Sequence, residues 1–226
     1  MPSKSENSPI PAADRELRIS EIFYSLQGES RTVGWPTVFI RLTGCPLRCG
    51  YCDTSYAFTG GERMTLSEIL AQVAEYSPRF VTVTGGEPLA QRDCWLLLKM
   101  LCDAGYTTSV ETSGAIDISQ VDKRVSTVMD IKTPGSGEVE RNLYKNLDLL
   151  KRKDQIKFVI TDHADYQWSR NFIDEKGLVG NFEILFSPVH GELEPAELAK
   201  WILDDNLQVR MQIQMHKYLW GDERGR

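Results

Sequence analysis

The fold is decided by three consecutive segments, TVFIRLTG at residues 37–44, TLSEILAQVAEY at 65–76 and FVTVTGG at 80–86. The first and third are short apolar runs rich in β-branched residues, which is typical of buried strands, whereas the second repeats its apolar residues with a helical period. Thr65 and Glu68 form a capping box at the start of that helix. The order strand, helix, strand predicts two parallel strands joined by a crossover helix.

The same alternation continues to the end of the chain. Gly105 follows the second predicted helix, where a left-handed residue commonly ends a helix. Six or seven parallel strands with crossover helices result, and this order fits both a doubly wound open sheet and a full or partial barrel. The further segments that read as helices or strands are LAQRDCWLLLKMLCDAG at 89–105, TTSVETSG at 107–114, VSTVMDIK at 125–132, NLYKNLDLLKR at 142–152, QIKFVIT at 155–161, ADYQWSRNFIDEKG at 164–177, FEILFSP at 182–188, EPAELAKWILDD at 194–205 and LQVRMQIQMH at 207–216.

Polar residues stand where the predicted strands end. In both architectures ligands bind at the carboxyl edge of the sheet, because loops and helix amino termini converge there. We therefore expect a site built from the whole chain at that edge. The segments concerned are Gly44-Cys45, Thr84 to Glu87, Glu111 to Ser113, Asp130 to Lys132 and Ser187-Pro188.

Length, charge and composition indicate the number of domains and exclude some classes of partner. The chain has 226 residues, enough for one domain, and a net charge of −6 that repels phosphate backbones and anionic lipid. It carries no apolar run long enough to span a bilayer and no secretory signal at its start, so we expect a cytoplasmic protein without direct nucleic-acid or membrane partners. Residues 1–16 are rich in Ser, Pro and charge and are predicted to be a flexible tail, followed by one catalytic domain at 17–226.

Three of the five cysteines lie in one short loop, Cys45, Cys49 and Cys52, directly after a predicted strand. The spacing favours metal ligands over disulfide partners. Three thiolates suit a 4Fe–4S cluster with one open iron, whereas a structural zinc site needs a fourth ligand. That ligand would have to be a distant histidine, His163, His190 or His216. The other two cysteines, Cys94 and Cys102, lie in an apolar helical pattern and read as buried hydrophobic residues.

The cysteine loop resembles that of the radical S-adenosylmethionine (SAM) enzymes. Tyr51 precedes the last cysteine, and the run Gly85 to Pro88 follows the next predicted strand, as in that family. The resemblance implies a 4Fe–4S cluster whose open iron binds SAM and cleaves it to a 5'-deoxyadenosyl radical. The two glycines allow close approach of backbone to a ligand.

Further motifs resemble one family of radical SAM enzymes, the 7-carboxy-7-deazaguanine synthases. The resemblance implies a partial (β/α) barrel with about six parallel strands and a reduced set of helices. It also implies a Mg²⁺-dependent ring contraction of a small pterin substrate, 6-carboxy-5,6,7,8-tetrahydropterin, with release of ammonia, on the pathway to queuosine. A homodimer and an electron donor such as flavodoxin are implied partners. The motifs are EIFYSLQGES at 21–30, FIRLTGC at 39–45, Cys52-Asp53-Thr54, TGGEP at 84–88, ETSG at 111–114 and MHKYLWG at 215–221.

Two residues support this chemistry directly. Arg41 lies mid-strand in phase with Cys45, so its side chain is expected on the cluster side. Its partner is either a buried carboxylate in a structural salt bridge or the substrate carboxylate, which matches the guanidinium fork. Gln27 offers an amide that can donate to and accept from a pterin edge, although it also fits a polar turn.

The resemblance also implies the roles of individual residues. Thr54 is the implied magnesium ligand, and the three loop cysteines are the implied cluster ligands. Two segments implied to lie near SAM differ from the sequence usual in the family. Asp130-Ile131-Lys132 stands where relatives usually have Ser-Pro-Lys, and Ser187 to His190 stands where they commonly have Gln-Pro. The chain also ends in DERGR, where relatives place a contact to substrate. The implied substrate contacts are Leu26, Gln27, Gly28, Arg41 and Thr84, and the implied SAM contacts are Tyr51, Cys52, Asp53, Gly86, Glu87, Asp130, Ile131 and Lys132.

Two other functions share part of this pattern. A glycyl-radical-activating enzyme has the same cysteine loop but does not need the Cys-Asp-Thr or LQGE segments. An iron–sulfur electron carrier normally fills every cluster corner with protein ligands, and a zinc-stabilised module needs a fourth ligand. No fourth cysteine lies near the loop to serve either.

Overall fold

The computed structural model describes residues 11–226. Residues 1–10 of the predicted tail lie outside the described part of the chain. Ala12–Asp14 form a short 3₁₀ helix (η1), so regular structure begins before the boundary expected at residue 17. Arg15 helps to hold this segment, because its Nη1 donates to Oδ1 of Asp93 at 2.7 Å. Within the described residues, no helix has both the length and the apolar character needed to cross a membrane.

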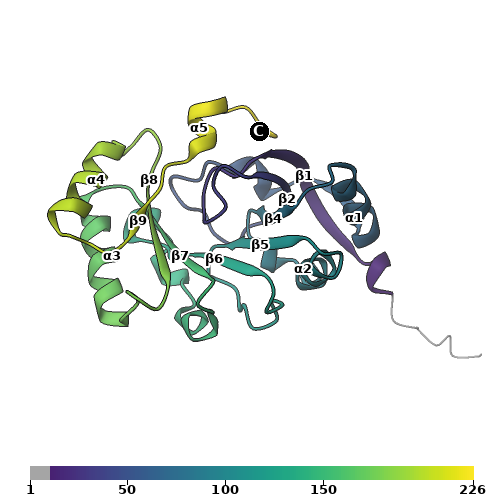
Figure 1. Ribbon diagram of the computed structural model, residues 1–226, viewed down its shortest axis with the longest axis horizontal. Coiled ribbons are helices and arrows are strands. Elements are labelled where there is room, and N and C mark those ends of the chain that lie inside the picture. Colours follow the sequence, from purple (N-terminus) through teal and green to yellow (C-terminus); the bar gives the residue numbers. More distant parts are fainter. Residues whose placement is uncertain (1–10) are drawn as a thin grey trace, which may run out of the picture.

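One mixed sheet runs through the molecule in the strand order β3-β1-β2-β4-β5-β6-β7-β8-β9. The seven strands β2, β4, β5, β6, β7, β8 and β9 pair in parallel, each with the next in this order. The sheet curls into an open, partial barrel (Figure 1). The predicted partial barrel of parallel strands is confirmed, with two antiparallel strands, β1 and β3, added at one edge. The strands are β1 Glu16–Leu26, β2 Pro36–Leu42, β3 Glu62–Thr65, β4 Phe80–Gly85, β5 Thr107–Thr112, β6 Ser126–Asp130, β7 Gln155–Ile160, β8 Glu183–Pro188 and β9 Arg210–Met211.

Helices α1, α2, α3 and α4 lie on the outside of the curved sheet, whereas α5 lies over its open side (Figure 1). The predicted capping box is present: the Thr65 side chain accepts the N–H of Glu68, and Oε2 of Glu68 accepts the N–H of Thr65 at 2.8 Å. The α-helices are α1 Leu66–Glu75, α2 Cys94–Asp103, α3 His163–Lys176, α4 Pro195–Asp204 and α5 Met215–Trp220. The other 3₁₀ helices are η2 Ser55–Phe58, η3 Pro88–Ala90, η4 Pro134–Ser136, η5 Val139–Arg141 and η6 Tyr144–Leu149.

Two segments differ from the sequence prediction. Residues 142–152 were expected to form an α-helix, but η6 is a 3₁₀ helix, because the buried amide of Asn146 donates to the carbonyls of Gly114 and Ile116 and ties the segment to a loop. Residues 207–216 were expected to form a strand. Only the two residues of β9 pair with β8, and the chain then turns into α5.

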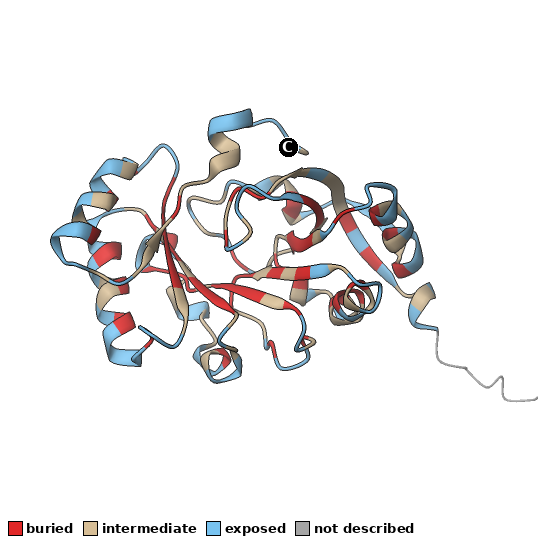
Figure 2. Cartoon of the chain, in the orientation of Figure 1, coloured by how far each residue is buried: buried red, intermediate tan, exposed pale blue. Residues whose placement is uncertain are grey.

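The core forms two clusters on the helix-covered side of the sheet. One joins β1, β2, β4 and β5 to α1 and α2, and the other joins β6, β7 and β8 to α3 and α4. Figure 2 shows the buried residues concentrated along the strands and on the inner faces of these helices. Cys94 is fully buried in the first cluster, as predicted, whereas Cys102 is only partly buried and packs against that cluster. The opposite, concave side of the sheet carries the polar side chains of the cavity together with some apolar ones, such as Phe23 and Phe39.

Candidate active site

Two adjoining cavities lie at the carboxyl ends of the parallel strands, the edge predicted from the sequence. The first is lined by the ends of β1, β2, β4 and β5 together with α5, and the second by the cysteine loop and the ends of β6, β7 and β8. Cys45, Cys52, Asp130 and Lys132 line both, so the two cavities form one continuous site. We refer to them as the substrate cavity and the cluster cavity.

The three loop cysteines are free and partly buried, and all three line the cluster cavity. Burial raises the pKa of each thiol. Among residues 11–226, no group of three or more His, Cys, Asp or Glu side chains is arranged to hold a single metal ion. His163 instead packs against Tyr166 and Trp201, away from the loop. His190 lines the cluster cavity and His216 the substrate cavity, but within the described residues neither joins the thiols in a group placed to hold one metal ion.

The cluster cavity also holds polar atoms without a protein partner. The hydroxyl of Tyr51 and Oδ1 of Asp130 are buried and make no hydrogen bond within the described chain. Lys132 lies between them, with its Nζ 3.0 Å from Oδ2 of Asp130 and 5.9 Å from the centre of the Tyr51 ring. Buried polar groups are normally satisfied, so these atoms point to a polar ligand. The three thiols and this polar wall fit a 4Fe–4S cluster that carries SAM.

The glycine pair lets two strand ends approach each other. Gly85 has φ +151°, and a Cβ there would overlap the backbone of Leu42 at the end of β2. A Cβ on Gly86 would overlap the carbonyl of Gly44 and the side chain of Cys45. The two glycines are therefore needed because the end of β4 lies directly against the end of β2 and the start of the cysteine loop. Gly86 also lines both cavities.

Glu87 lies outside both cavity walls and is fully buried. Its carboxylate accepts the N–H of Leu89, the hydroxyls of Thr112 and Ser113 and the N–H of Ser113. Burial, the largest influence, raises its pKa despite these bonds. The structure thus places this expected SAM contact as a brace between the ends of β4 and β5. Ile131, another expected contact, has its side chain in the second core cluster.

The expected substrate residues Leu26, Gln27, Gly28, Arg41 and Thr84 all line the substrate cavity. Nε2 of Gln27 lies 3.4 Å from Oε1 of Glu111, and the hydroxyl of Thr84 donates to Oε2 of the same carboxylate at 3.0 Å. The structure brings together residues from β1, β2, β4 and β5 that are far apart in the sequence. Arg41 has a carboxylate partner, Glu21, with its Nε 2.7 Å from Oε1.

Sequence reasoning placed Glu111 at this edge but missed the charged group that it forms with Glu29 and Lys157 in the same wall. Nζ of Lys157 lies 2.8 Å from Oε2 of Glu29. Burial opposes ionisation of Glu29, but Lys157 outweighs it and lowers the Glu29 pKa, whereas burial and the charge of Glu29 raise the pKa of Glu111. A signal was present: Lys157 interrupts the apolar run of QIKFVIT, and a lysine inside such a strand needs a partner.

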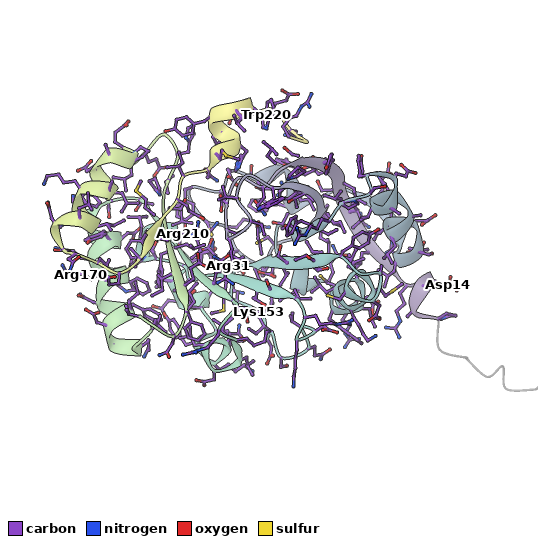
Figure 3. All side chains as sticks on the ribbon, in the orientation of Figure 1. Asp14, Arg31, Lys153, Arg170, Arg210 and Trp220 are labelled. Carbon is purple, nitrogen blue, oxygen red and sulfur yellow. The ribbon has the colours of Figure 1, made fainter. Side chains whose placement is uncertain are left out.

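Glu29 reaches Lys157 because the connection between β1 and β2 crosses the open barrel (Figure 1). The backbone N–H of Arg31 donates to Oε1 of Gln155 on β7 at 3.0 Å, and its Nε donates to Oε2 of Glu183 on β8 at 2.8 Å. Its Nη1 donates to the carbonyl of Lys153 at 3.1 Å, and Figure 3 shows these two residues close together over the central strands. Arg31 therefore fixes the segment that carries the substrate-cavity residues.

The expected magnesium residue, Thr54, lines the substrate cavity two positions after Cys52. Its hydroxyl donates to Oδ1 of Asp53 at 2.7 Å, and Oδ2 of Asp53 accepts Nε2 of Gln214 at 2.8 Å. The hydroxyl oxygen of Thr54 keeps its acceptor lone pairs. Asp53, expected to contact SAM, lines both cavities.

The end of the chain covers the mouth of the substrate cavity. His216 and Arg226 are both in its wall, and burial lowers the pKa of His216. The guanidinium carbon of Arg224 lies 4.1 Å from the centre of the Tyr56 ring. Ser187 to His190 line the cluster cavity, as expected for a strand end near SAM.

Comparison with known proteins agrees with this geometry. The Radical SAM superfamily model matches residues 39–127. The 7-carboxy-7-deazaguanine synthase of Chlorobaculum tepidum is 45% identical over 218 residues, covering 95% of this chain and 99% of that protein. That of Koribacter versatilis is 41% identical, covering 92% and 98%. The crystal structure of QueE from Escherichia coli has the same fold, with a TM-score of 0.73 over 89% of this chain and 95% of that one at 22% identity. The chain belongs to the 7-carboxy-7-deazaguanine synthase family of radical SAM enzymes.

Proposed function

We propose that this enzyme converts 6-carboxy-5,6,7,8-tetrahydropterin to 7-carboxy-7-deazaguanine with release of ammonia, a step that leads to queuosine. The observation that carries the assignment is the joining of two cavities through Cys45 and Cys52: one has the Arg41 guanidinium and the Gln27 amide in its wall, and the other has the three thiols. The names and full-length similarity of the relatives support the same reaction. They favour it over activation of a glycyl-radical protein.

Cys45, Cys49 and Cys52 would hold the 4Fe–4S cluster. Bound together, the cluster and SAM supply the radical that starts the ring contraction. Tyr51 and Asp130 would satisfy their buried unpartnered atoms on polar groups of SAM, with Lys132 balancing charge beside them. Glu87 would support the site without contacting SAM, because its carboxylate already accepts hydrogen bonds from the N–H groups of Leu89 and Ser113.

The wall of the substrate cavity would bind and orient the pterin. Arg41 offers a guanidinium to the carboxylate. The amide of Gln27 can donate to and accept from the pterin edge, and it lies beside the carboxyl of Glu111, whose pKa is raised by burial and by the charge of Glu29. Lys157 keeps Glu29 ionised at the boundary of the two cavities.

Thr54 would contribute one oxygen ligand to Mg²⁺, with the remainder from water and substrate, since this ion takes few ligands from protein. The ion would stabilise charge that develops during the ring contraction. A homodimer and a flavodoxin-like electron donor, which follow from the family resemblance, complete the proposal together with the cytoplasmic location expected from the sequence.

An anaerobic assay tests the function. Reconstituted enzyme is incubated with carboxytetrahydropterin, SAM, Mg²⁺ and dithionite, and the products are analysed by mass spectrometry. We expect 7-carboxy-7-deazaguanine and ammonia in equal amounts, dependent on both substrate and SAM. Cleavage of SAM without conversion of the pterin would refute the proposed substrate.

A further inference from the structure

Arg41 is held from one side by its neighbour on the adjacent strand. Glu21 and Arg41 are register partners in the antiparallel pair β1 and β2. Nε of Arg41 donates to Oε1 of Glu21 at 2.7 Å, and the hydroxyl of Tyr56 donates to the same oxygen at 2.8 Å. The two charged side chains are only 16% and 20% exposed. The carboxylate is thus fixed by two donors from different elements.

The guanidinium is also flanked by aromatic rings. Its central carbon lies 5.7 Å from the centre of the Phe23 ring and 5.9 Å from that of Tyr56. Within residues 11–226, the only hydrogen bond that the Arg41 side chain donates is the one from Nε. Arg41 lines the substrate cavity. A guanidinium has five N–H groups, so its terminal fork is left for a ligand.

We propose that Glu21 is a positioning residue, which turns the guanidinium of Arg41 so that its two terminal nitrogens face the carboxylate of the substrate. This rests on the proposed function. By accepting from Nε, Glu21 fixes the plane of the fork, and the flanking rings restrict its tilt. Glu21 also balances the charge of Arg41 before substrate binds, which lowers the cost of keeping the cation in a partly buried cavity.

A different role for Glu21 makes the opposite prediction. If Glu21 instead competed with the substrate for Arg41, its neutralisation would release the guanidinium and tighten substrate binding. If Glu21 orients Arg41, its neutralisation weakens substrate binding. The direction of the change therefore separates the two roles.

The experiment measures equilibrium binding of the carboxypterin to reconstituted enzyme with SAM bound and the cluster oxidised, so that no turnover occurs. We expect Glu21→Gln to weaken binding about tenfold, the scale of one misaligned charge-assisted hydrogen bond. Tyr56→Phe should weaken it less, in the same direction, and it provides the test if Glu21→Gln does not fold. Cluster content and SAM affinity should match the parent in both. The matched control is Glu16→Gln, because this residue pairs with Arg63 on the exposed part of β1.

A double-mutant cycle shows whether Glu21 acts through Arg41. In an Arg41→Ala background, Glu21→Gln should cause no further loss, and a pterin without the carboxylate should bind the parent and Glu21→Gln equally. Tighter or unchanged carboxypterin binding in Glu21→Gln, or additive losses in the double variant, would overturn the positioning role. If Arg41→Ala alone leaves carboxypterin binding unchanged, the substrate contact of Arg41 itself is wrong and the proposal fails with it.

Discussion

Gly28 lies directly against His216. A Cβ added at residue 28 would overlap Nδ1 of the imidazole, and the carbonyl of Gly28 accepts the N–H of Met215 at 3.2 Å. The segment after β1 and the start of α5 thus meet in the wall of the substrate cavity. Two motifs from opposite ends of the sequence, LQGE and MHKYLWG, form one surface because this position has no side chain.

Gly28→Ala should therefore push α5 away from the cavity. Overpacking of this kind costs about 1–3 kcal/mol, so we expect the KM for the carboxypterin to rise about tenfold while cluster content stays unchanged. Steady-state kinetics and iron analysis measure the two. Gly34→Ala is the control: it lies in the same connection, has open space around it and suffers only backbone strain at φ +83°. Equal KM values for Gly28→Ala and the parent would contradict the prediction.

The cysteines divide into two groups with different expected behaviour. Replacing Cys45, Cys49 or Cys52 by Ala should abolish cluster assembly, because each thiol is needed for one corner. Replacing Cys94 or Cys102 should leave about four irons per chain, since these side chains pack in the core. Iron and sulfide analysis with visible absorbance, bleached by dithionite, is the measurement. A full complement of zinc in place of iron after reconstitution would refute the cluster.

Much of the fold was predictable because local patterns decide it. The parallel strands carry apolar residues that pack into the two core clusters, and α1 carries its own capping box. The strand β1 was not predicted, because it alternates between exposed and buried residues only over its first four positions and is mostly half-buried after them. Its strand character depends on pairing with β2 and β3. The 3₁₀ form of η6 likewise depends on hydrogen bonds from Asn146 to a distant loop.

The site was predictable where the chemistry lies in consecutive residues, as in the cysteine loop. Ion pairs between strands could not be predicted from the sequence. The partner of Arg41 depends on the β1–β2 register, and the pairing of Glu29 with Lys157 depends on how the connection after β1 crosses the barrel. Glu87 shows a further limit: the motif identifies it as important, but only its buried hydrogen bonds show that it braces β5.

The carboxyl of Glu111 should make stability depend on pH. Burial and Glu29 raise its pKa above 4.5, while Lys157 and Arg41 oppose the shift. A raised carboxyl pKa means that the folded state binds the proton more tightly. The contribution to stability is therefore greatest below pH 4.5 and is lost as the pH rises through the folded-state pKa.

Glu111→Gln removes this titration. The unfolding free energy of the parent minus that of Glu111→Gln should fall as the pH rises from about 4.5 to about 8. Urea denaturation of the two proteins in a series of buffers measures the difference. A difference that stays constant over this range would show that Glu111 does not titrate above its ordinary pKa.

Thr54→Val tests the magnesium ligand. Valine keeps the shape of threonine but removes the oxygen, so turnover should slow by about tenfold or more and lose its stimulation by Mg²⁺. Cluster content and SAM affinity should persist. Thr59→Val is a suitable control, because Thr59 follows η2 and lines neither cavity. Equal Mg²⁺ stimulation in Thr54→Val and the parent would remove Thr54 from the metal site.

The loop after β6 is joined to the cysteine loop by a backbone hydrogen bond. The N–H of Gly50, between the second and third cluster cysteines, donates to the carbonyl of Ser136 at 3.1 Å. The N–H of Gly135 donates to Oδ1 of Asp165 at 2.8 Å. A Cβ at residue 135 would overlap that carboxylate and the hydroxyl of Thr161. The position of the cysteine loop therefore depends on a glycine that never contacts it.

Gly135→Ala should displace this support. Overlap with Asp165 and Thr161 costs about 1–3 kcal/mol, which corresponds to a Tm lower by about 2–12 °C in a chain of this size. The displaced loop should also release iron faster during anaerobic dialysis against a chelator. Gly137→Ala is the matched control: its φ of +75° is strained for alanine, but no atom lies within 4 Å of the added Cβ. It should lower the Tm slightly and retain iron like the parent, whereas parental Tm and iron retention in Gly135→Ala would disprove the support.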